Sequence, residues 1–384
     1  MWEHASTRWS EEQRALRAAV TELGGVLSKD HVERDAAGEF NRDGWERLRD
    51  IGLFGLPFDS RWGGLGQDLL TTMYVLEGLG YGCRDGGLSF SATTHLVSTG
   101  IALRHFGSDA LRDRCLPGVC DGSTIGAHAI SEPDAGSDMM GMRTVAERDG
   151  GHFVLNGGKS FVSNGPIADL FVVYARTGRP GSPAALSAFL VERDTPGLTV
   201  GRPLAKMGLR TSPLCELFLA DCRVPAGHLI GSLGAGFLVL NHVMKWEILC
   251  SFIVNVGEMQ HRLERCVEYA RTRRQFGSPI GAFQSVANKV VDMRIAVENA
   301  RRWLYDTAAK LQQNRDVTAD VAISKLIASE GNLASAQLAV QIFGGYGYMA
   351  EYGLEKDLRA AVAGTIYSGT SEVQRQRIAK MTGL

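Results

Sequence analysis

A glutamate in an apolar stretch is the first residue whose setting indicates chemistry. Glu247 lies in "VMKWEILCSFIV", a largely apolar run of helical character, where a buried carboxylate is costly unless it is paired or neutral. Lys245 is only two positions away and therefore faces elsewhere on a helix. A carboxylate screened from water, with its pKa raised toward neutrality, can act as a general base. The alternative is a structural glutamate paired with an arginine on another helix.

A second feature lies near the C-terminus, in "IYSGTSEVQR", residues 366–375. The stretch has the form of an active-site loop, with a tight Gly-Thr-Ser turn leading into a polar helix. Its central residues are Ser368 and Gly369. Because a serine hydroxyl at neutral pH does not remove a proton from carbon without help, any base for such a reaction must lie elsewhere in the chain.

The elements that would position these residues fall into three regions. Residues 1–124 show mainly helical patterns, beginning with an N-cap at Ser10 and interrupted at glycines. Residues 125–230 contain β-branched and aromatic runs at spacings typical of an antiparallel barrel or sandwich. Residues 231–384 return to long helices. We therefore expect an α+β chain with a helical domain, a β domain and a helical bundle, in that order.

Composition narrows the class of protein. Hydrophobic residues make up 45% and charged residues 22% of the 384, and the formal net charge is −1 with no long run of one sign, so nothing indicates a nucleic-acid or anionic-membrane partner. The N-terminus has no signal-peptide core, and "ILCSFIVNV" is shorter than the roughly 20 residues of a membrane span. We expect a soluble, cytoplasmic protein. No strand leads into G-x-G-x-x-G, which disfavours a Rossmann site.

The cysteines do not indicate a metal site. Seven are scattered through the chain, none forms a C-x-x-C pair, and no Cys/His cluster has zinc spacing. We expect buried thiols in a reducing compartment and no bound metal.

Four stretches, in this order, resemble the acyl-CoA dehydrogenase family of flavoproteins: "AISEPDAGSD" (129–138), "YARTRRQFGSPIGAFQ" (269–284), "QIFGGYGYMAEYGLEKDLR" (341–359) and "IYSGTSEVQR" (366–375). The resemblance extends over essentially the whole chain, including "PFDSRWGGLGQ" near residue 60. It implies FAD, a homotetramer, a central antiparallel β-barrel or sandwich and a C-terminal four-helix bundle.

The resemblance also implies which residues contact the cofactor. The flavin group is Ile130, Ser131, Gly136 and Ser137, with Phe161 stacking near the flavin and Ser163 facing its N5 edge. The residues that reach the FAD of a neighbouring subunit are Arg273, Gln275, Phe276, Gln284, Gln341, Gly344 and Gly345. Thr370 and Glu372 hold the other end of the cofactor. The chemistry is suitable, because arginine pairs with pyrophosphate and glycine lets the backbone approach phosphate. Each residue alone could instead be a solvated charge or part of a helix cap.

In the family, the reaction removes a proton from Cα of an acyl thioester and transfers hydride from Cβ to flavin N5. The position of Ser368 is often the glutamate base, but some branches place the base on the first long C-terminal helix, where Glu247 matches. We therefore expect Glu247 as the base, with Ser368 and Gly369 in the substrate pocket. Ile248, where such relatives usually carry arginine, and Ala360, where "LRD" is common, are departures that indicate an unusual acyl group.

Within the family, "MKWE" together with "IYSGTSE" is most similar to oxidases of aminoacyl groups held on carrier proteins. We expect a prolyl-like thioester on a carrier protein, in natural-product biosynthesis. The alternatives are a catabolic dehydrogenase of a short or branched acyl-CoA, a flavin monooxygenase or oxidase on the same scaffold, and a non-catalytic acyl-binding flavoprotein. The electron acceptor, a flavoprotein or oxygen, stays open.

Overall fold

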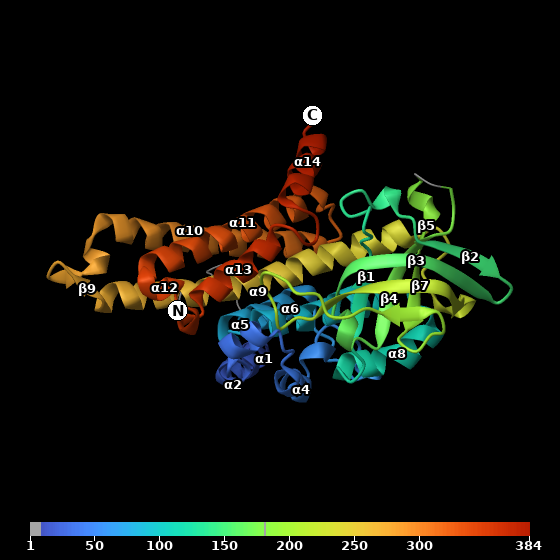
Figure 1. Ribbon diagram of the computed structural model, residues 1–384, viewed down its shortest axis with the longest axis horizontal. Coiled ribbons are helices and arrows are strands. Elements are labelled where there is room, and N and C mark those ends of the chain that lie inside the picture. Colours follow the sequence, from blue (N-terminus) through green and yellow to red (C-terminus); the bar gives the residue numbers. More distant parts are fainter. Residues whose placement is uncertain (1–8, 180–181) are drawn as a thin grey trace.

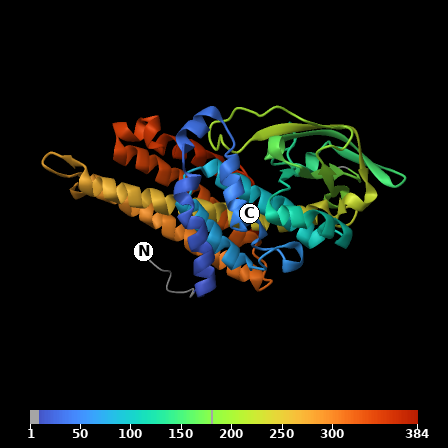
Figure 2. The same ribbon diagram turned by 90° about the horizontal axis from the view of Figure 1, so that it is seen from below.

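The computed structural model describes residues 9–179 and 182–384, and it has three regions in chain order (Figure 1). Helices come first, a β-sheet follows, and long helices return at the C-terminus. The sheet and the far end of the helical bundle lie at opposite ends of the longest axis (Figure 1). Seen from below, the N-terminal helices lie across the middle of the molecule (Figure 2). The α+β arrangement expected from the sequence is confirmed.

Several of the N-terminal helices begin at polar caps. Ser10 accepts a hydrogen bond from the Gln13 backbone N–H, and the Gln13 side chain accepts one from the Ser10 N–H, so the expected cap is a full capping box. Residues His95–Ile101 form a π-helical segment that continues directly from one α-helix into the next. The α-helices are α1 (Glu11–Glu22), α2 (Gly24–Leu27), α3 (His31–Ala37), α4 (Arg42–Asp50), α5 (Leu69–Gly82), α6 (Gly86–Thr94), α7 (Ala102–Phe106) and α8 (Asp109–Asp121).

The central sheet has eight strands and is mixed rather than purely antiparallel. Its order is β6-β7-β3-β2-β4-β5-β8, with β1 paired to β4 off this path. Most pairs are antiparallel, but β1 and β2 both run parallel to β4. The strands are β1 (Gly126–Ala129), β2 (Val145–Asp149), β3 (His152–Ser163), β4 (Leu170–Arg176), β5 (Leu186–Glu192), β6 (Leu198–Val200), β7 (Leu214–Pro225) and β8 (Leu229–Ile230).

The C-terminal region is built on one long helix, α9 (Gly236–Thr272), which runs from the sheet to the far end of the bundle (Figure 1). By length and composition alone α9 could cross a membrane, but 61% of its most apolar window is buried inside the protein, as in a core helix. The remaining elements are the hairpin β9 (Arg274–Gln275) and β10 (Ser278–Pro279), then α10 (Gln284–Gln312), α11 (Thr318–Phe343), α12 (Gly345–Tyr348), α13 (Leu354–Gly364) and α14 (Ser371–Met381).

Two hydrophobic cores stabilise this arrangement. The larger joins the N-terminal helices, α9 to α11 and one face of the sheet. The smaller lies on the other face of the sheet. All seven cysteines are buried free thiols. Within the described ranges, no group of three or more His, Cys, Asp or Glu side chains is placed to hold a metal ion.

Candidate active site

The Glu247 carboxylate lies where α9 passes the π-helical segment, strand β1 and the loop before α14. Ser368 Oγ donates a hydrogen bond to Glu247 Oε1 over 2.5 Å. Ser98 Oγ donates to Glu247 Oε2 over 3.0 Å, and His128 Nδ1 lies 3.7 Å from the same oxygen. The side chain of Glu247 is only 18% exposed. The structure therefore brings together the two residues, Glu247 and Ser368, that the sequence identified as alternative positions for the base.

The π-helical segment positions Ser98. A π-helix is rare and is frequently found at functional sites, and this one is held in the core by His95. The His95 Nδ1 accepts from the Gly126 backbone N–H over 3.0 Å, and its Nε2 lies 2.9 Å from the Val119 carbonyl oxygen. Burial lowers the pKa of His95 to about 4, so the ring is neutral and structural.

His128 is anchored on its other side by a tyrosine. Its Nε2 lies 3.1 Å from the Tyr174 hydroxyl, and the two rings meet edge to face at 5.2 Å between centroids. His128 on β1 pairs with the neighbouring strand β4, which carries Tyr174. Because one ring nitrogen contacts Tyr174, the other points at Glu247.

Burial raises the pKa of Glu247, but the nearby His128 ring, with the hydrogen bonds from Ser368 and Ser98, holds that pKa below the ordinary glutamate value. The expectation that screening from water would raise this pKa toward neutrality is therefore wrong for the ligand-free site. Glu247 is ionised at neutral pH. Its partners are serines and a histidine, and in the described part of the chain no arginine pairs with it.

The loop that carries Ser368 has a constrained backbone. Ser368 has φ of 55° and Gly369 has φ of 88°, both in the left-handed region that a serine rarely adopts. The Gln374 side chain donates to the carbonyl oxygens of Ser368 and Gly369 at 3.0 and 3.3 Å. This tie from α14 fixes the loop, so the Ser368 hydroxyl is aimed at α9.

The residues expected near a flavin lie beside the sheet. A buried ion pair of Lys159 and Glu132, 2.8 Å apart, ties the loop after β1 to β3. Lys159 also donates to the Ile130 carbonyl oxygen, and the Ser160 N–H donates to the Ser131 carbonyl oxygen. Phe161 has φ of 57° and is 67% exposed, a combination of backbone strain and exposed aromatic surface that is typical of a ligand contact. Gly136, Ser137 and Ser163 lie on the same loop and strand.

A second set of expected cofactor residues lies far from this loop. Arg273 follows the last residue of α9, and its guanidinium lies 5.5 Å from the Tyr346 ring centroid. With a rise of about 1.5 Å per residue, Arg273 is about 39 Å from Glu247 along the helix axis. The exposed residues at this end are Gln275, Phe276, Gln284, Gln341, Gly344 and Gly345. The chain therefore does not bring the two sets together by itself.

A third set lies at the start of α14. Thr370 caps this helix by accepting from the Val373 N–H over 3.3 Å. Thr370 and Glu372 line an open groove of about 400 Å³ together with Glu330 and Gln337 of α11. The groove offers hydroxyl, amide and carboxylate groups to a polar ligand. It lies next to the Ser368 loop in the sequence.

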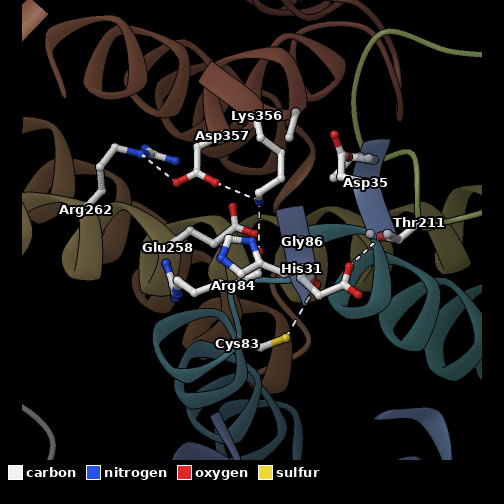
Figure 3. Close-up of a pocket in the computed structure, with 14 residues that line it drawn as sticks. His31, Asp35, Cys83, Arg84, Gly86, Thr211, Glu258, Arg262, Lys356 and Asp357 are labelled. Atoms are coloured by element: carbon white, nitrogen blue, oxygen red, sulfur yellow. Dashed lines mark hydrogen bonds and ion pairs between the residues drawn. The ribbon is translucent and has the colours of Figure 1, made fainter. Parts of the chain in front are cut away.

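A buried charge cluster holds the end of α13 against α9 (Figure 3). Lys356 Nζ donates to Asp357 Oδ1 and to the Arg84 carbonyl oxygen, both over 2.9 Å. Arg262 Nε lies 3.9 Å from Asp357 Oδ2. Burial raises the pKa of Asp357, but Lys356, Arg262 and Arg84 together hold it well below its usual range. The cluster fixes the helix from which the Ser368 loop begins.

Three family models match almost the whole chain. The acyl-CoA dehydrogenase N-terminal, middle and C-terminal domains match residues 10–123, 127–222 and 234–382, respectively. The chain belongs to the acyl-CoA dehydrogenase family. The expected fold is therefore confirmed, with the parallel pairings in the sheet as the detail that the sequence pattern did not predict.

The similar proteins within this family include carrier-protein enzymes. The chain is 39% identical, over 94% of its length and 93% of the relative, to an L-prolyl-[peptidyl-carrier protein] dehydrogenase of Serratia sp. (strain ATCC 39006). It superimposes on the prolyl acyl carrier protein oxidase AnaB with a TM-score of 0.96, 40% identity and coverage of 98% and 100% of the two chains. PigA, solved with FAD and proline, superimposes with a TM-score of 0.95, 37% identity and 99% coverage of each chain.

Two residues beside the Glu247 carboxylate, Ser98 and His128, were not predicted from the sequence of this acyl-CoA dehydrogenase family member. Ser98 and His128 lie about 149 and 119 residues before Glu247, and no local motif links them to it. The signal available was the polar run "TTHLVST" inside an apolar helix and a histidine in the short strand "GAHA". Neither pattern specifies a partner without the three-dimensional fold.

Proposed function

We propose that the protein is an FAD-dependent dehydrogenase of an acyl or aminoacyl thioester, with a prolyl-like group on a carrier protein as substrate, in natural-product biosynthesis. The observation that carries the proposal is the carboxylate of Glu247 hydrogen-bonded to Ser368, at the two places where the family positions its base. The carrier-dependent enzymes among its similar proteins support the substrate class. The catabolic acyl-CoA dehydrogenase is the alternative that the test below separates.

The residues present fit FAD. At Gly136, Gly344 and Gly345 an added Cβ would meet nothing within 4 Å, so the backbone there is open to a ligand phosphate or ring edge. Phe276 is 94% exposed with φ of 49°, an arrangement that suits a contact outside this chain. We propose that the flavin is held by Ile130, Ser131, Gly136, Ser137, Phe161 and Ser163, and that Thr370 and Glu372 hold the other end of the cofactor.

The distance along α9 supports a cofactor shared between subunits. The residues Arg273, Gln275, Phe276, Gln284, Gln341, Gly344 and Gly345 lie at the far end of the bundle. Since a single dinucleotide does not span about 39 Å of helix, we assign these residues to the FAD of a neighbouring copy. Arg273 would pair with the pyrophosphate. A homotetramer is the assembly that we propose for this arrangement.

Glu247 performs the proton transfer in the proposed mechanism. Its pKa lies below the ordinary value, so it is ionised and able to accept the Cα proton. Ser98 and His128 hold Oε2 and leave Oε1 with the rotatable Ser368 hydroxyl as its partner. An entering acyl group takes the place of that hydroxyl beside Oε1. FAD, when bound, supplies the acceptor for the hydride from Cβ.

We also propose the domain boundaries 1–124, 125–230 and 231–384 and a cytoplasmic location. The three family-model matches fall inside these ranges, which supports them. The burial of α9 in the helical bundle supports a protein that does not cross a membrane.

The experiment that tests the substrate assignment compares one acyl group attached to two different thiol carriers. Prolyl thioester on a carrier protein and prolyl-CoA are mixed anaerobically with the holoenzyme at low and moderate salt, and flavin reduction is followed by absorbance. We expect faster reduction with the carrier, and weaker association as salt rises, because carrier proteins are acidic near the phosphopantetheine serine. Equal or faster reduction by prolyl-CoA would support the catabolic alternative instead.

A further inference from the structure

A small cavity of about 20 Å³ begins one helical turn along α9 from Glu247. Ser251, Asn255 and Glu258 follow Glu247 by four, eight and eleven positions, so they lie on the same face of the helix. All three line a cavity that Tyr367, the neighbour of Ser368, also lines. The cavity therefore adjoins the carboxylate from two elements, α9 and the loop before α14.

Two hydrogen-bond acceptors in this cavity lack partners. Ser251 is 4% exposed, and its buried Oγ has no hydrogen-bond partner among the described residues. The same holds for Asn255 Oδ1. Most buried polar atoms in proteins are hydrogen-bonded, so two such atoms lining one cavity indicate that the cavity receives a polar group.

The orientation of the Asn255 amide shows which polar group is needed. Asn255 Nδ2 donates to Glu258 Oε2 over 3.0 Å, which leaves the carbonyl oxygen as the free end of the amide. An acceptor requires a donor, so the group that fits carries N–H or O–H. Gly86 keeps the carboxylate of Glu258 accessible, because a Cβ there would lie 3.1 Å from Glu258 Oε1.

An apolar acyl chain does not suit this cavity. It would cover Ser251 Oγ and Asn255 Oδ1 and leave both without hydrogen bonds. Each buried acceptor left in this way lowers affinity by about tenfold. Ala360, the position where "LRD" is common in the family, lines the same cavity with a methyl group. The lining at this position therefore departs from the usual family pattern.

We propose that Ser251 and Asn255 are specificity residues that select acyl groups carrying an amine near Cα. The ring N–H of a prolyl group has this chemistry, and a straight fatty chain does not. The inference rests on the proposed function and deepens it, because it names the side chains that distinguish an aminoacyl thioester from an apolar one of the same size.

The test uses two thioesters of the same thiol carrier, L-prolyl and cyclopentanecarbonyl, whose acyl groups differ at one ring position. Binding to the Glu247→Gln holoenzyme is measured by the change in flavin absorbance, so that no turnover is needed. We expect prolyl to bind about a hundredfold more tightly, about tenfold for each acceptor. Adding either Ser251→Ala or Asn255→Leu should reduce that preference by about tenfold. Ser324→Ala, which changes a buried serine of α11 that is hydrogen-bonded to Thr307 of α10, serves as the matched control and should keep the preference.

Equal affinity for the two ligands, or a preference that survives both variants, would overturn the inference and leave water as the occupant of the cavity. Both thioesters have the same thiol carrier, so the result does not depend on whether a carrier protein or CoA carries the natural substrate. Ser251→Ala removes a hydroxyl without partners and should not lower Tm. A fall of more than about 2 °C would instead give Ser251 a structural role and overturn its assignment.

Discussion

Ser368 donates a hydrogen bond to Glu247 over 2.5 Å, although 121 residues separate them in the sequence. In the mechanism proposed above, the hydroxyl occupies the place beside the carboxylate that a substrate Cα would reach. Glu247 would then supply the negative charge, and Ser368 would fill the space until a substrate enters. The predictions that follow concern this pair, its partners and the elements that hold it.

Changing Glu247 to glutamine keeps the size and the hydrogen-bond acceptor but removes the basicity. We expect the rate of flavin reduction by substrate to fall by about 10²–10⁴ while substrate binding is retained. Anaerobic stopped-flow absorbance measures the rate, and titration measures the binding. Reduction at nearly the wild-type rate would show that Glu247 is structural.

Moving the carboxylate across the hydrogen bond should restore part of the activity. The double variant Glu247→Gln/Ser368→Glu places a base on the other side of the same 2.5 Å contact. We expect it to reduce flavin at least about tenfold faster than Glu247→Gln alone, since general-base catalysis contributes about 10²–10⁴. A double variant as slow as the single one would contradict the view that the two positions serve the same point in space.

His128 should set the pH at which the site becomes active. The His128 ring is the leading influence that lowers the pKa of Glu247 against burial. In His128→Phe, burial dominates and this pKa rises. Because the base works only when ionised, the acidic limb of the pH–rate profile should move to higher pH, with the rate lost as pH falls through the new pKa. His128→Gln, which retains a donor, should shift the profile less.

The matched control for the histidine is His152→Gln at the start of β3, where the side chain belongs to a different part of the sheet. Its profile should coincide with that of the wild type. If His128→Phe also leaves the profile unchanged, the contact of 3.7 Å to Glu247 carries no electrostatic influence on the base.

Arg273→Ala should weaken FAD binding and subunit assembly together. The residue lies at the end of α9 opposite to Glu247, and its proposed partner is the pyrophosphate of a neighbouring cofactor. Bound FAD measured from the absorbance ratio and mass measured by light scattering report the two effects. Arg49→Ala, a charged residue on the N-terminal helix α4, is the control. Full FAD occupancy in Arg273→Ala would contradict the shared-cofactor assignment.

Asp357→Asn tests the buried charge cluster. Removing this carboxylate leaves Lys356, Arg262 and Arg84 without their central partner, and we expect a loss of about 3–5 kcal/mol in the free energy of unfolding. Because the folded-state pKa of Asp357 is depressed, its stabilising contribution is full above the unfolded-state pKa and is lost as pH falls further. The difference in free energy of unfolding between the wild type and Asp357→Asn, measured by urea unfolding, should therefore become smaller as pH falls.

The exposed pair of Arg47 and Asp50 gives the comparison for this cluster, with side chains 60% and 69% exposed. Asp50→Asn should change the free energy of unfolding by less than about 1 kcal/mol. Equal effects of the two substitutions would show that the buried network contributes no more than a surface pair.

Several parts of the fold and site could be predicted from the sequence because their signals are local. The apolar run around Glu247 and the glycine turn at Ser368 are both visible within a dozen residues. The parallel pairing of β1 with β4 is not, because it depends on a crossover through β2 and β3. The lowered pKa of Glu247 could not be predicted from the sequence either, since it depends on Ser98 and His128, which only the folded chain brings near.

The π-helical turn at His95–Ile101 has an evolutionary consequence. Such a turn contains one residue more than an α-helix of the same length would need, and deleting one residue between His95 and Ser98 would restore the regular helix. Each α-helical position advances the side chain by about 100° around the axis, so Ser98 would turn away from Glu247 while the helices before and after kept their places. A single-codon deletion or insertion could in this way remove or create a donor to the base, and change the chemistry of the site without altering the scaffold.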